Sequence, residues 1–435
     1  MSLFGSLTAA ISGLTAQSRA LGHISDNVAN SQTVGYKRVD TNFVSYLTQS
    51  SASTHLPGAT IARPSYTNSA QGTVEQSENP LAMAISGQGF FAVAAATGTN
   101  NGQPVFDDRQ FFTRAGDFGL DQDGYLVNGS GYYLKGWPAD PNTGNPDRTN
   151  LTPIRVSQQV FNPVATTEIE LGANLPSATV DNDSISTQAE LYDSLGTLHT
   201  VNLTFTKNTS NEWTLSIDVP DAVTATAGTV DLQFGTAASA TTTPGTLGNM
   251  LNATGTVVLP PSNNPGDLAA VSFDVDFGQG TQTVSLNFGA FAEAQGLTQY
   301  SSETFEIRNR NQNGVPLGSY SGLSIAPSGD ISVNYDNGQS RVVARIPLVA
   351  FNDPDALQRL DGQAFMRTPE SGEARITDAS SNGVGKLVVS SVERSNVDIA
   401  NEFTKLILAQ RAYTANTKVV TTSDEMLQDT INMRR

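Results

Sequence analysis

The chain of 435 residues contains no cysteine and is poor in histidine, tryptophan and charged residues. The lack of cysteine excludes disulfides and thiolate metal sites, and it leaves the redox compartment undetermined. The three histidines, His23, His55 and His199, lie far apart without metal-ligand spacing, so no zinc site is expected. Charged residues make up only 15% of the chain, and Gly, Ser, Thr, Asn and Gln are abundant. This balance suits an extracellular β-rich protein better than a cytoplasmic enzyme.

Basic residues are scarce relative to acidic ones, and the net charge is −17. Residues 1–38 carry one acid and three bases, and residues 396–435 carry five of each, so the segment between them carries −19. An acidic surface repels nucleic acid and anionic membrane. We therefore expect no nucleic-acid partner. The nearly neutral ends can pack against copies of themselves without strong repulsion.

Long apolar runs and a basic leader are also missing. No apolar run approaches the length of a transmembrane helix, so no membrane insertion is expected. The first basic residue is Arg19, and the start therefore lacks the basic region of a Sec-type signal peptide. A cytoplasmic protein would show the same two absences.

Signatures of catalysis or cofactor binding are equally absent. Asp121-Gln-Asp123-Gly124 resembles part of an EF-hand loop, but Gly119 and Ser130 then occupy the positions of the first ligand and the bidentate glutamate. A hairpin turn is the favoured interpretation. Gly87-Gln-Gly89 lacks the third glycine of a dinucleotide loop, and no Gly-x-Ser-x-Gly elbow occurs. We expect no enzyme activity, no cofactor and no metal.

Both ends of the chain carry helical periodicity, because large apolar residues recur there at spacings of three, four or seven. Asn396 and Asp398 are candidate N-caps for the C-terminal helix, with Glu402 in its first turn. The pattern predicts two terminal helices that pair as a coiled coil, although an ordinary helical hairpin beside a globular core fits it as well. The predicted self-assembly residues are Leu3, Leu7, Ile11, Leu14, Leu21, Ile24, Val28, Phe403, Leu406, Tyr413, Val420, Leu427 and Ile431.

The middle of the chain predicts antiparallel sheets with one buried and one solvated face. Trp213, Leu215 and Ile217, for example, alternate with polar residues. The Thr/Ala/Gly-rich run 222–256 is interpreted as an exposed insertion rather than core.

The predicted fold is therefore mainly β with paired terminal α-helices, in a nested order of domains. The first domain in the sequence is closed by the last segment, and the second by the second-last. The predicted parts are a terminal helical polymerisation domain at 1–38 and 395–435, an extended connector at 39–72, an inner β domain at 73–145 and 318–394, and an outer β domain at 146–317.

Two pairs of short motifs give the ends a specific resemblance. Asn27-Val-Ala-Asn30 with Thr33-Val-Gly35-Tyr36-Lys37 is similar to the N-terminal signature of the axial proteins of the bacterial flagellum. Ser395-Asn-Val-Asp398 with Gln410-Arg-Ala-Tyr413-Thr-Ala-Asn416 resembles their C-terminal signature, in the form found in hook and distal-rod proteins. The motif residues are Asn27, Asn30, Thr33, Gly35, Tyr36, Lys37, Asn396, Asp398, Gln410, Arg411, Tyr413 and Asn416.

The resemblance implies a structural subunit that forms a helical homopolymer, with its terminal helices lining an inner tube. It also implies export through the flagellar type III apparatus without a cleaved signal peptide, and an extracellular location in the flagellum. The implied partners are copies of the chain itself, rod proteins, the hook cap, hook-associated junction proteins and the export apparatus.

A hook subunit, the flexible joint between rod and filament, is favoured over three alternatives. A distal-rod subunit would have similar ends but little sequence between the halves of the inner β domain, whereas residues 151–317 suffice for a further domain. A secreted β-rich adhesin would explain the acidic middle but not the paired terminal heptads. An extracellular hydrolase would need a catalytic constellation, and none is recognisable.

Overall fold

The computed structural model describes residues 3–50, 55–140, 143–239, 242–381 and 383–433. The chain forms two compact units, of which the second interrupts the first in the sequence. Unit 1 comprises Met1–Gln158, Ser321–Asn334 and Ser340–Arg435, and unit 2 comprises Gln159–Tyr320 and Tyr335–Gln339. Unit 2 begins later than the predicted residue 146, because β11 (Thr152–Pro153) still pairs with β10 of unit 1.

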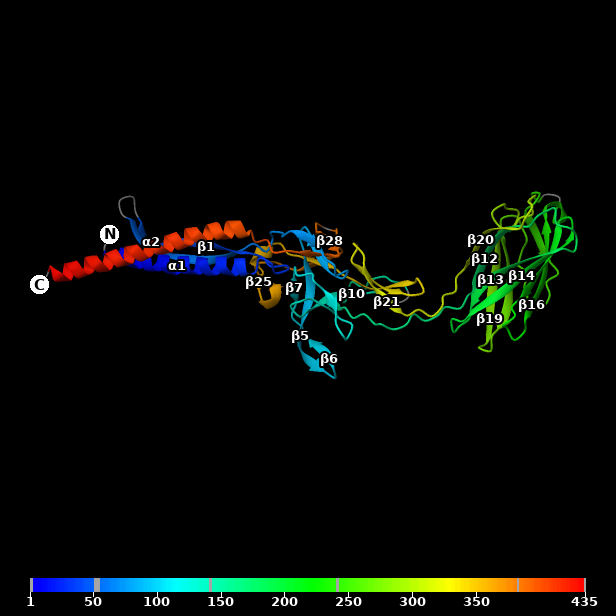
Figure 1. Cartoon of the computed structure of the whole chain (residues 1–435), viewed down its shortest axis with the longest axis horizontal. Coiled ribbons are helices and arrows are strands. Elements are labelled where there is room, and N and C mark those ends of the chain that lie inside the picture. The colour runs from blue at the N-terminus through cyan, green and yellow to red at the C-terminus, as the bar shows by residue number, and fades with distance from the viewer. Residues whose placement is uncertain (1–2, 51–54, 141–142, 240–241, 382, 434–435) are drawn as a thin grey trace. The chain divides into compact units, whose positions relative to one another are not determined.

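The two ends of the chain form long helices that lie side by side in unit 1, α1 (Leu3–Ala29) and α2 (Ile399–Asn432) (Figure 1). Asp398 caps α2, because its carboxylate accepts hydrogen bonds from the backbone N–H groups of Ala400 and Asn401. Gly13 lies opposite Asn416 and Asn27 opposite Glu402, so the helices run antiparallel. The predicted pairing of the terminal helices is confirmed.

The predicted extended connector at 39–72 is wrong for most of its length. The segment forms a β-hairpin of β1 (Val39–Ser50) and β2 (His55–Tyr66), paired antiparallel and packed on α1. Its Ser, Thr, Ala and Pro content resembles a linker, but the strand-favouring Val, Thr, Phe and Tyr residues of β1 decide the conformation.

The inner β structure of unit 1 joins strands from both halves of the chain. In its main sheet the strand order is β21-β22-β23-β10-β5-β7-β26-β25, with β6, β8, β9, β11, β24 and β27 beside this path. Two further pairs, β3 with β29 and β4 with β28, connect the start of the inner domain to the segment before α2. Aromatic rings fill the core between these strands. Phe112 and Phe351, for example, meet edge to face with centroids 4.9 Å apart.

The strands of this part are β3 (Val74–Gln76), β4 (Met83–Ser86), β5 (Phe90–Asn100), β6 (Gln103–Phe106), β7 (Phe111–Thr113), β8 (Gly119–Leu120), β9 (Leu126–Val127), β10 (Tyr132–Pro138), β21 (Tyr320–Ile325), β22 (Asp330–Tyr335), β23 (Ser340–Arg345), β24 (Leu348–Ala350), β25 (Gln358–Arg359), β26 (Ala364–Met366), β27 (Arg375–Thr377), β28 (Lys386–Val389) and β29 (Ser391–Glu393).

Unit 2 has a five-stranded sheet in the order β13-β14-β15-β16-β17 and a four-stranded sheet in the order β18-β19-β12-β20. Both contribute to one apolar core. The predicted alternation is confirmed at Trp213, Leu215 and Ile217, which are fully buried. The strands are β12 (Glu168–Asn174), β13 (Ser184–Tyr192), β14 (Leu198–Thr209), β15 (Glu212–Asp218), β16 (Thr226–Phe234), β17 (Leu247–Leu251), β18 (Leu268–Asp276), β19 (Thr281–Ala290) and β20 (Glu306–Gln312).

The prediction that 222–256 is an exposed insertion is also wrong. Strands β16 and β17 extend the five-stranded sheet, and Val230, Leu232 and Phe234 belong to the core. The many Thr, Ala and Gly residues around these alternating apolar positions hide the strand pattern, but burial of the three large side chains determines the fold.

Candidate assembly interface

Small side chains form the seam between α1 and α2. Ala10, Ala16 and Ala20 are buried on the face of α1 that packs against α2 and the hairpin, and Ala409 of α2 is buried as well. A Cβ atom on Gly13 would lie 2.9 Å from Nδ2 of Asn416, so this position needs a residue without a side chain unless Asn416 moves. Helix axes can approach closely where the contacting side chains are small. The seam is therefore narrow, and it contains few of the large residues of the predicted heptads.

The predicted self-assembly residues mostly flank this seam. On α1, Ile24 is buried and Ile11 is 50% exposed. The half-buried ones are Leu7, Leu14, Leu21, Val28, Leu406, Val420 and Leu427, and the exposed ones on α2 are Phe403, Tyr413 and Ile431. The side chain of Leu3 lies outside the described residues.

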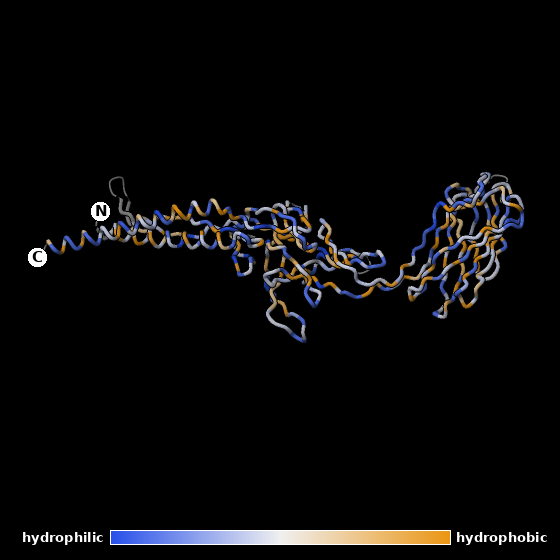
Figure 2. The backbone as a smooth tube through the Cα atoms, in the orientation of Figure 1, coloured by the Kyte–Doolittle hydropathy of each residue, from blue (hydrophilic) through white to orange (hydrophobic). Residues whose placement is uncertain are grey.

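The prediction from the heptad pattern missed several exposed apolar residues of α2. At 100° per residue, nine of the large apolar side chains fall into two rows, one on each side of the buried positions Glu402, Ala409 and Ser423. Figure 2 shows hydrophobic residues recurring along both helices. A helical wheel centred on Ala409 rather than on the leucines would have found both rows. The first row contains Ile399, Phe403, Leu406, Tyr413 and Ile431, and the second contains Leu408, Val419, Met426 and Met433.

Asn27, the first residue of the N-terminal motif, joins both helices to the hairpin. Its side chain is fully buried, and its Nδ2 donates to Oε2 of Glu402 (3.0 Å) and to the carbonyl oxygen of Val39 (2.9 Å). Its Oδ1 accepts from the backbone N–H of Val39 (2.9 Å) and from the hydroxyl of Tyr36 (3.2 Å). An amide has four such bonding positions, and here each is occupied. No aliphatic residue could replace these contacts.

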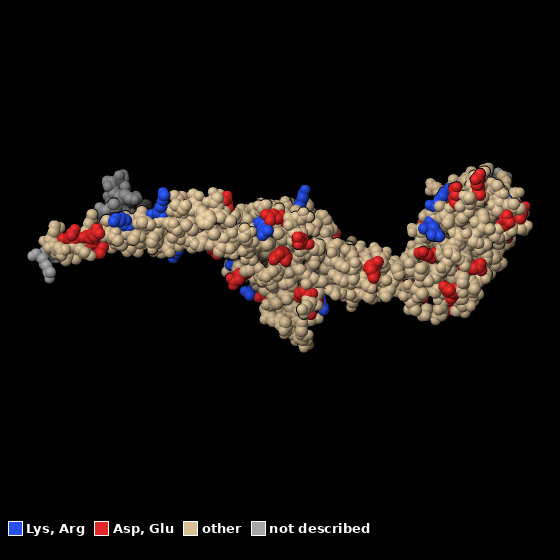
Figure 3. Space-filling model, in the orientation of Figure 1, with Lys and Arg blue, Asp and Glu red and all other residues tan. Residues whose placement is uncertain are grey.

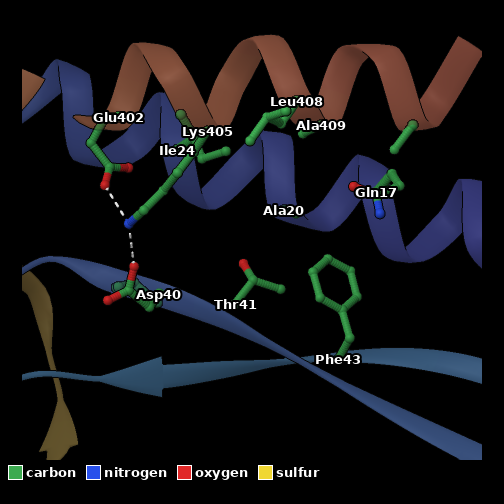
Figure 4. A pocket seen from close by; sticks show the side chains of 12 residues that line it. Gln17, Ala20, Ile24, Asp40, Thr41, Phe43, Glu402, Lys405, Leu408 and Ala409 are labelled. Atoms are coloured by element: carbon green, nitrogen blue, oxygen red, sulfur yellow. Dashed lines mark hydrogen bonds and ion pairs between the residues drawn. The ribbon is translucent and has the colours of Figure 1, made fainter. Parts of the chain in front are cut away.

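Glu402 continues this network toward a cavity between the helices and the hairpin (Figure 4). Lys405 Nζ lies 2.8 Å from Oε1 of Glu402 and 2.6 Å from Oδ1 of Asp40. Burial lowers the pKa of Lys405, but its hydrogen bonds to the two carboxylates outweigh this effect, and the pKa is raised overall. The adjoining cavity of about 350 Å³ is lined by residues of α1, α2 and β1, including Ile24, Phe43 and Leu408.

Lys37, at the end of the N-terminal motif, belongs to a fully buried charge cluster. Its ammonium contacts Oε1 of Glu393, and Nη1 of Arg114 lies 3.0 Å from the other carboxylate oxygen. Two cations thus share one anion. Burial, reinforced by Arg114 and only partly offset by Glu393, lowers the pKa of Lys37 to about 8. Glu393 and Arg114 were not singled out from the sequence, because their partners lie hundreds of residues away.

Gly35 brings the motif close to the inner β structure. Its backbone has a φ of +70°, and a Cβ atom would lie 2.5 Å from the backbone nitrogen of Ala115. Its own N–H donates to the carbonyl oxygen of Glu393 at 2.8 Å. A side chain at this position would therefore clash with backbone in an already unfavourable conformation.

The remaining motif residues fall into two groups. Those near the base of the helices make local bonds: Thr33 donates to Asn30 (3.2 Å), and Asn396 accepts from the backbone N–H of Arg38 (2.7 Å). By contrast, Gln410 and Arg411 have exposed side chains on α2. The motif thus combines residues that fix the helices to unit 1 with residues that face solvent.

Metal sites and membrane-spanning helices were also considered in the described part of the chain. No group of three or more His, Asp or Glu side chains there is placed to hold a metal ion. None of the described helices is long and apolar enough to cross a membrane.

Four family models match the chain in order. They are the flagella basal body rod protein model at residues 7–37, the flagellar hook protein FlgE/F/G D1 domain at 84–186, the flagellar basal body protein FlaE D2 domain at 163–315, and the flagellar basal body rod FlgEFG protein C-terminal model at 389–433. The first and last cover the two helices, and the D2 match lies within the sequence range of unit 2.

Curated relatives match the chain along its whole length. The flagellar hook protein of Brucella abortus is 31% identical and that of Rhizobium meliloti is 32% identical, each over 100% of both chains. The flagellar hook protein of Salmonella typhimurium is 29% identical over 99% of this chain and 100% of its own. All three relatives are hook proteins rather than distal-rod proteins. This polypeptide therefore belongs to the flagellar hook protein family.

Proposed function

We propose that α1, α2 and the hairpin β1–β2 form the surface through which this hook subunit polymerises into the flexible tube that transmits torque from rod to filament. The chain is a structural, non-enzymatic subunit of the bacterial flagellum. Its assembly surface is built from the two apolar rows of α2 and from the apolar residues of α1 and the hairpin that remain exposed. The partner for this surface is another copy of the same chain.

The exposed residues in the two rows of α2 are the observation that carries this proposal. Phe403 is 50% exposed, Leu408 61% and Met426 59%, although all three lie on a well-formed helix. Completing the burial of such side chains contributes about 1 kcal/mol each. Nine residues in the two rows therefore offer several kcal/mol per subunit, available only when another chain covers them. A helix that served only its own fold would have polar residues at these positions.

The contrast between helices and β structure accounts for stiffness and flexibility together. Contacts through large apolar side chains resist slipping, because each shift exposes apolar area to water. In unit 2 the large apolar residues lie mainly in its own core, and many strand residues that face outward are Ser, Thr, Asn and Gln. Contacts between such polar surfaces can rearrange through water at small cost. Torque is then transmitted through the helices, while the outer contacts adjust during bending.

Membership of the family supports a proposal for the other partners of the subunit. The subunit is exported by the flagellar export apparatus without cleavage and assembles outside the cell beneath a hook cap. Rod proteins contact one end of the polymer, and hook-associated junction proteins contact the other. The near-neutral termini and the acidic middle are compatible with these contacts.

The test compares two substitutions of equal charge. Phe403→Glu introduces a carboxylate into an apolar row of α2 at a side chain that is 50% exposed, so the melting temperature of the monomer changes little. Polymerisation, followed by electron microscopy under conditions in which the unmodified chain forms tubes, is abolished, because the charge would be buried between copies. Val223→Glu, at a 74% exposed position of unit 2, is the control and polymerises.

Leu14→Glu is a weaker probe, because Leu14 is already half-buried in the monomer and its loss mixes folding with assembly. Normal tubes from the Phe403→Glu chain would contradict the proposal.

A further inference from the structure

A row of four charged residues runs along the face of α2 opposite the seam. Arg411, Lys418 and Glu425 are spaced by seven residues, and Asp429 follows four residues later, so all four lie on one side of the helix. All four are exposed. Their signs are not mixed: the two bases come first and the two acids last. We call this row the charge stripe. Figure 3 shows acidic residues gathered near the C-terminal end of α2 and basic residues farther along the helix.

The fold of a single chain does not account for the charge stripe. None of its four residues takes part in the ion pairs found among the described residues. On α2 the position four residues before Arg411 is Ile407, and the position four residues after Lys418 is Thr422, so neither base has an acid one turn away. Glu425 and Asp429 are like charges at a spacing of four, an arrangement that destabilises an isolated helix.

We propose that the charge stripe is a docking surface for a second copy of this chain. The basic half of the stripe on one α2 lies beside the acidic half on the α2 of a neighbouring copy, with the two helices parallel and staggered. A stagger of 11 residues pairs Lys418 with Asp429, and one of 14 pairs Arg411 with Glu425. The offset along the helix axis is therefore about 16–21 Å. Ile407 and Met426, exposed beside the stripe, add apolar contact. This inference rests on the proposed polymerisation function.

The order of the charges favours a stagger over the other arrangements. Parallel helices in register would place like charges together, which is repulsive. An antiparallel pair would match the charges, but it uses the same patch on both copies and closes after two subunits. A staggered parallel contact leaves an unmatched basic half at one end and an unmatched acidic half at the other. Such a contact repeats, as a growing tube requires.

Reversing the charges tests the stripe. Arg411→Glu with Lys418→Glu gives an all-acidic stripe, and Glu425→Lys with Asp429→Lys gives an all-basic one. Each double variant alone is expected to raise the critical concentration for polymerisation on the order of tenfold, with an unchanged circular dichroism spectrum. An equimolar mixture of the two polymerises near the normal concentration, because each copy then meets its opposite. The chain with all four reversals polymerises normally too.

A matched control separates this effect from a general change of charge. Arg375→Glu with Lys386→Glu reverses two exposed basic residues in the β structure of unit 1, and it should leave the critical concentration unchanged. If the stripe variants polymerise as well as the control while the unmodified chain forms tubes, the inference fails and the proposed function stands. If the unmodified chain forms no tubes, the proposed function itself fails.

Cysteine cross-linking tests the stagger, since the natural chain has no cysteine to interfere. Arg411→Cys and Glu425→Cys, introduced together, lie about 21 Å apart on one helix, too far for a disulfide within one copy. Oxidation of the polymer is expected to give a ladder of dimers, trimers and longer products on a non-reducing gel. Dimers alone would show the closed antiparallel pair, and no cross-linked product would show that the stripes do not meet. Either result overturns the staggered contact.

Discussion

The buried cluster of Lys37, Arg114 and Glu393 predicts different losses of stability for two substitutions of similar size. Among the described residues, Glu393 is the only anion in contact with the two cations, and all three side chains are nearly or fully inaccessible to water. Glu393→Gln would leave two buried positive charges without an opposite charge. Lys37→Met would leave one cation facing one anion. The first change should therefore destabilise unit 1 far more than the second.

The expected magnitudes follow from the desolvation of charge. Removing one partner of a buried ion pair costs about 3–5 kcal/mol, because the remaining charge is uncompensated. Glu393→Gln should fall in this range and lower the melting temperature of unit 1 by roughly 10 °C. Lys37→Met keeps the Arg114–Glu393 contact and loses the bond of Lys37 to the carbonyl oxygen of Ala70 (2.7 Å), which is worth about 1 kcal/mol.

The two tryptophans of the chain allow unit 1 to be followed alone. Trp137 belongs to unit 1, and Trp213 lies in the core of unit 2. In a Trp213→Phe background, the fluorescence of Trp137 during urea unfolding reports on unit 1, and the shift of the midpoint gives the change in free energy. Glu75→Gln is the control. Its carboxylate pairs with Arg394 at the surface, so it should cost less than about 1 kcal/mol. Equal losses for Glu393→Gln and Lys37→Met would refute the reasoning.

Three further predictions concern pH, the backbone and the outer unit. The pKa of Lys37 falls from 10.5 to about 8 on folding, so the unfolded chain binds more protons than the folded chain between these pH values. The contribution of Lys37 to the free energy of unfolding therefore rises with pH across this window, by up to about 3 kcal/mol. Urea titrations of the unmodified chain and of Lys37→Met at pH 8 and pH 10 measure this change in the free energy of unfolding. A difference in stability between the two chains that is the same at both pH values would count against the prediction. Gly35→Ala should destabilise unit 1 by about 2 kcal/mol or more in the same fluorescence assay, since the added Cβ meets backbone at a positive φ. A chain in which a short turn replaces residues 159–320 should still be exported and polymerise, with altered tube flexibility under electron microscopy; failure to form any tube would contradict it.

The sequence allowed the helices and the alternating strands to be predicted because large apolar residues mark their buried faces. Trp213, Leu215 and Ile217 show the period of two clearly, and the terminal heptads show the helical period. The seam itself escaped prediction, because Ala10, Gly13 and Ala409 give no strong apolar signal. The hairpin at 39–66 escaped it for a similar reason, since its small and polar residues pack on α1 without a periodic run of large ones.

Polar contacts between distant parts of the sequence were the least predictable. The motif marked Lys37 and Asn27, but nothing in it identified Glu393 or Glu402 as their partners. Those partners lie 356 and 375 positions away. A glutamate that becomes buried on folding cannot be distinguished in the sequence from one that stays in solvent. Only the fold brings the start of the chain against the segment before α2, and only then does the burial of these charges become visible.

The small residues of the seam and the large residues of the two rows are consequences of each other. If Leu406, Phe403 and Tyr413 filled the space between α1 and α2, the pair would be stable alone and would present little apolar surface to a neighbour. Alanine and glycine in the seam bring the helices together at low gain in free energy and leave the large side chains outside. The base of the pair is then fixed by the buried network around Asn27 and Glu402, where every hydrogen-bonding position of the amide is occupied. A subunit built in this way holds its helices in place for assembly while reserving most of their apolar surface for the copies that follow.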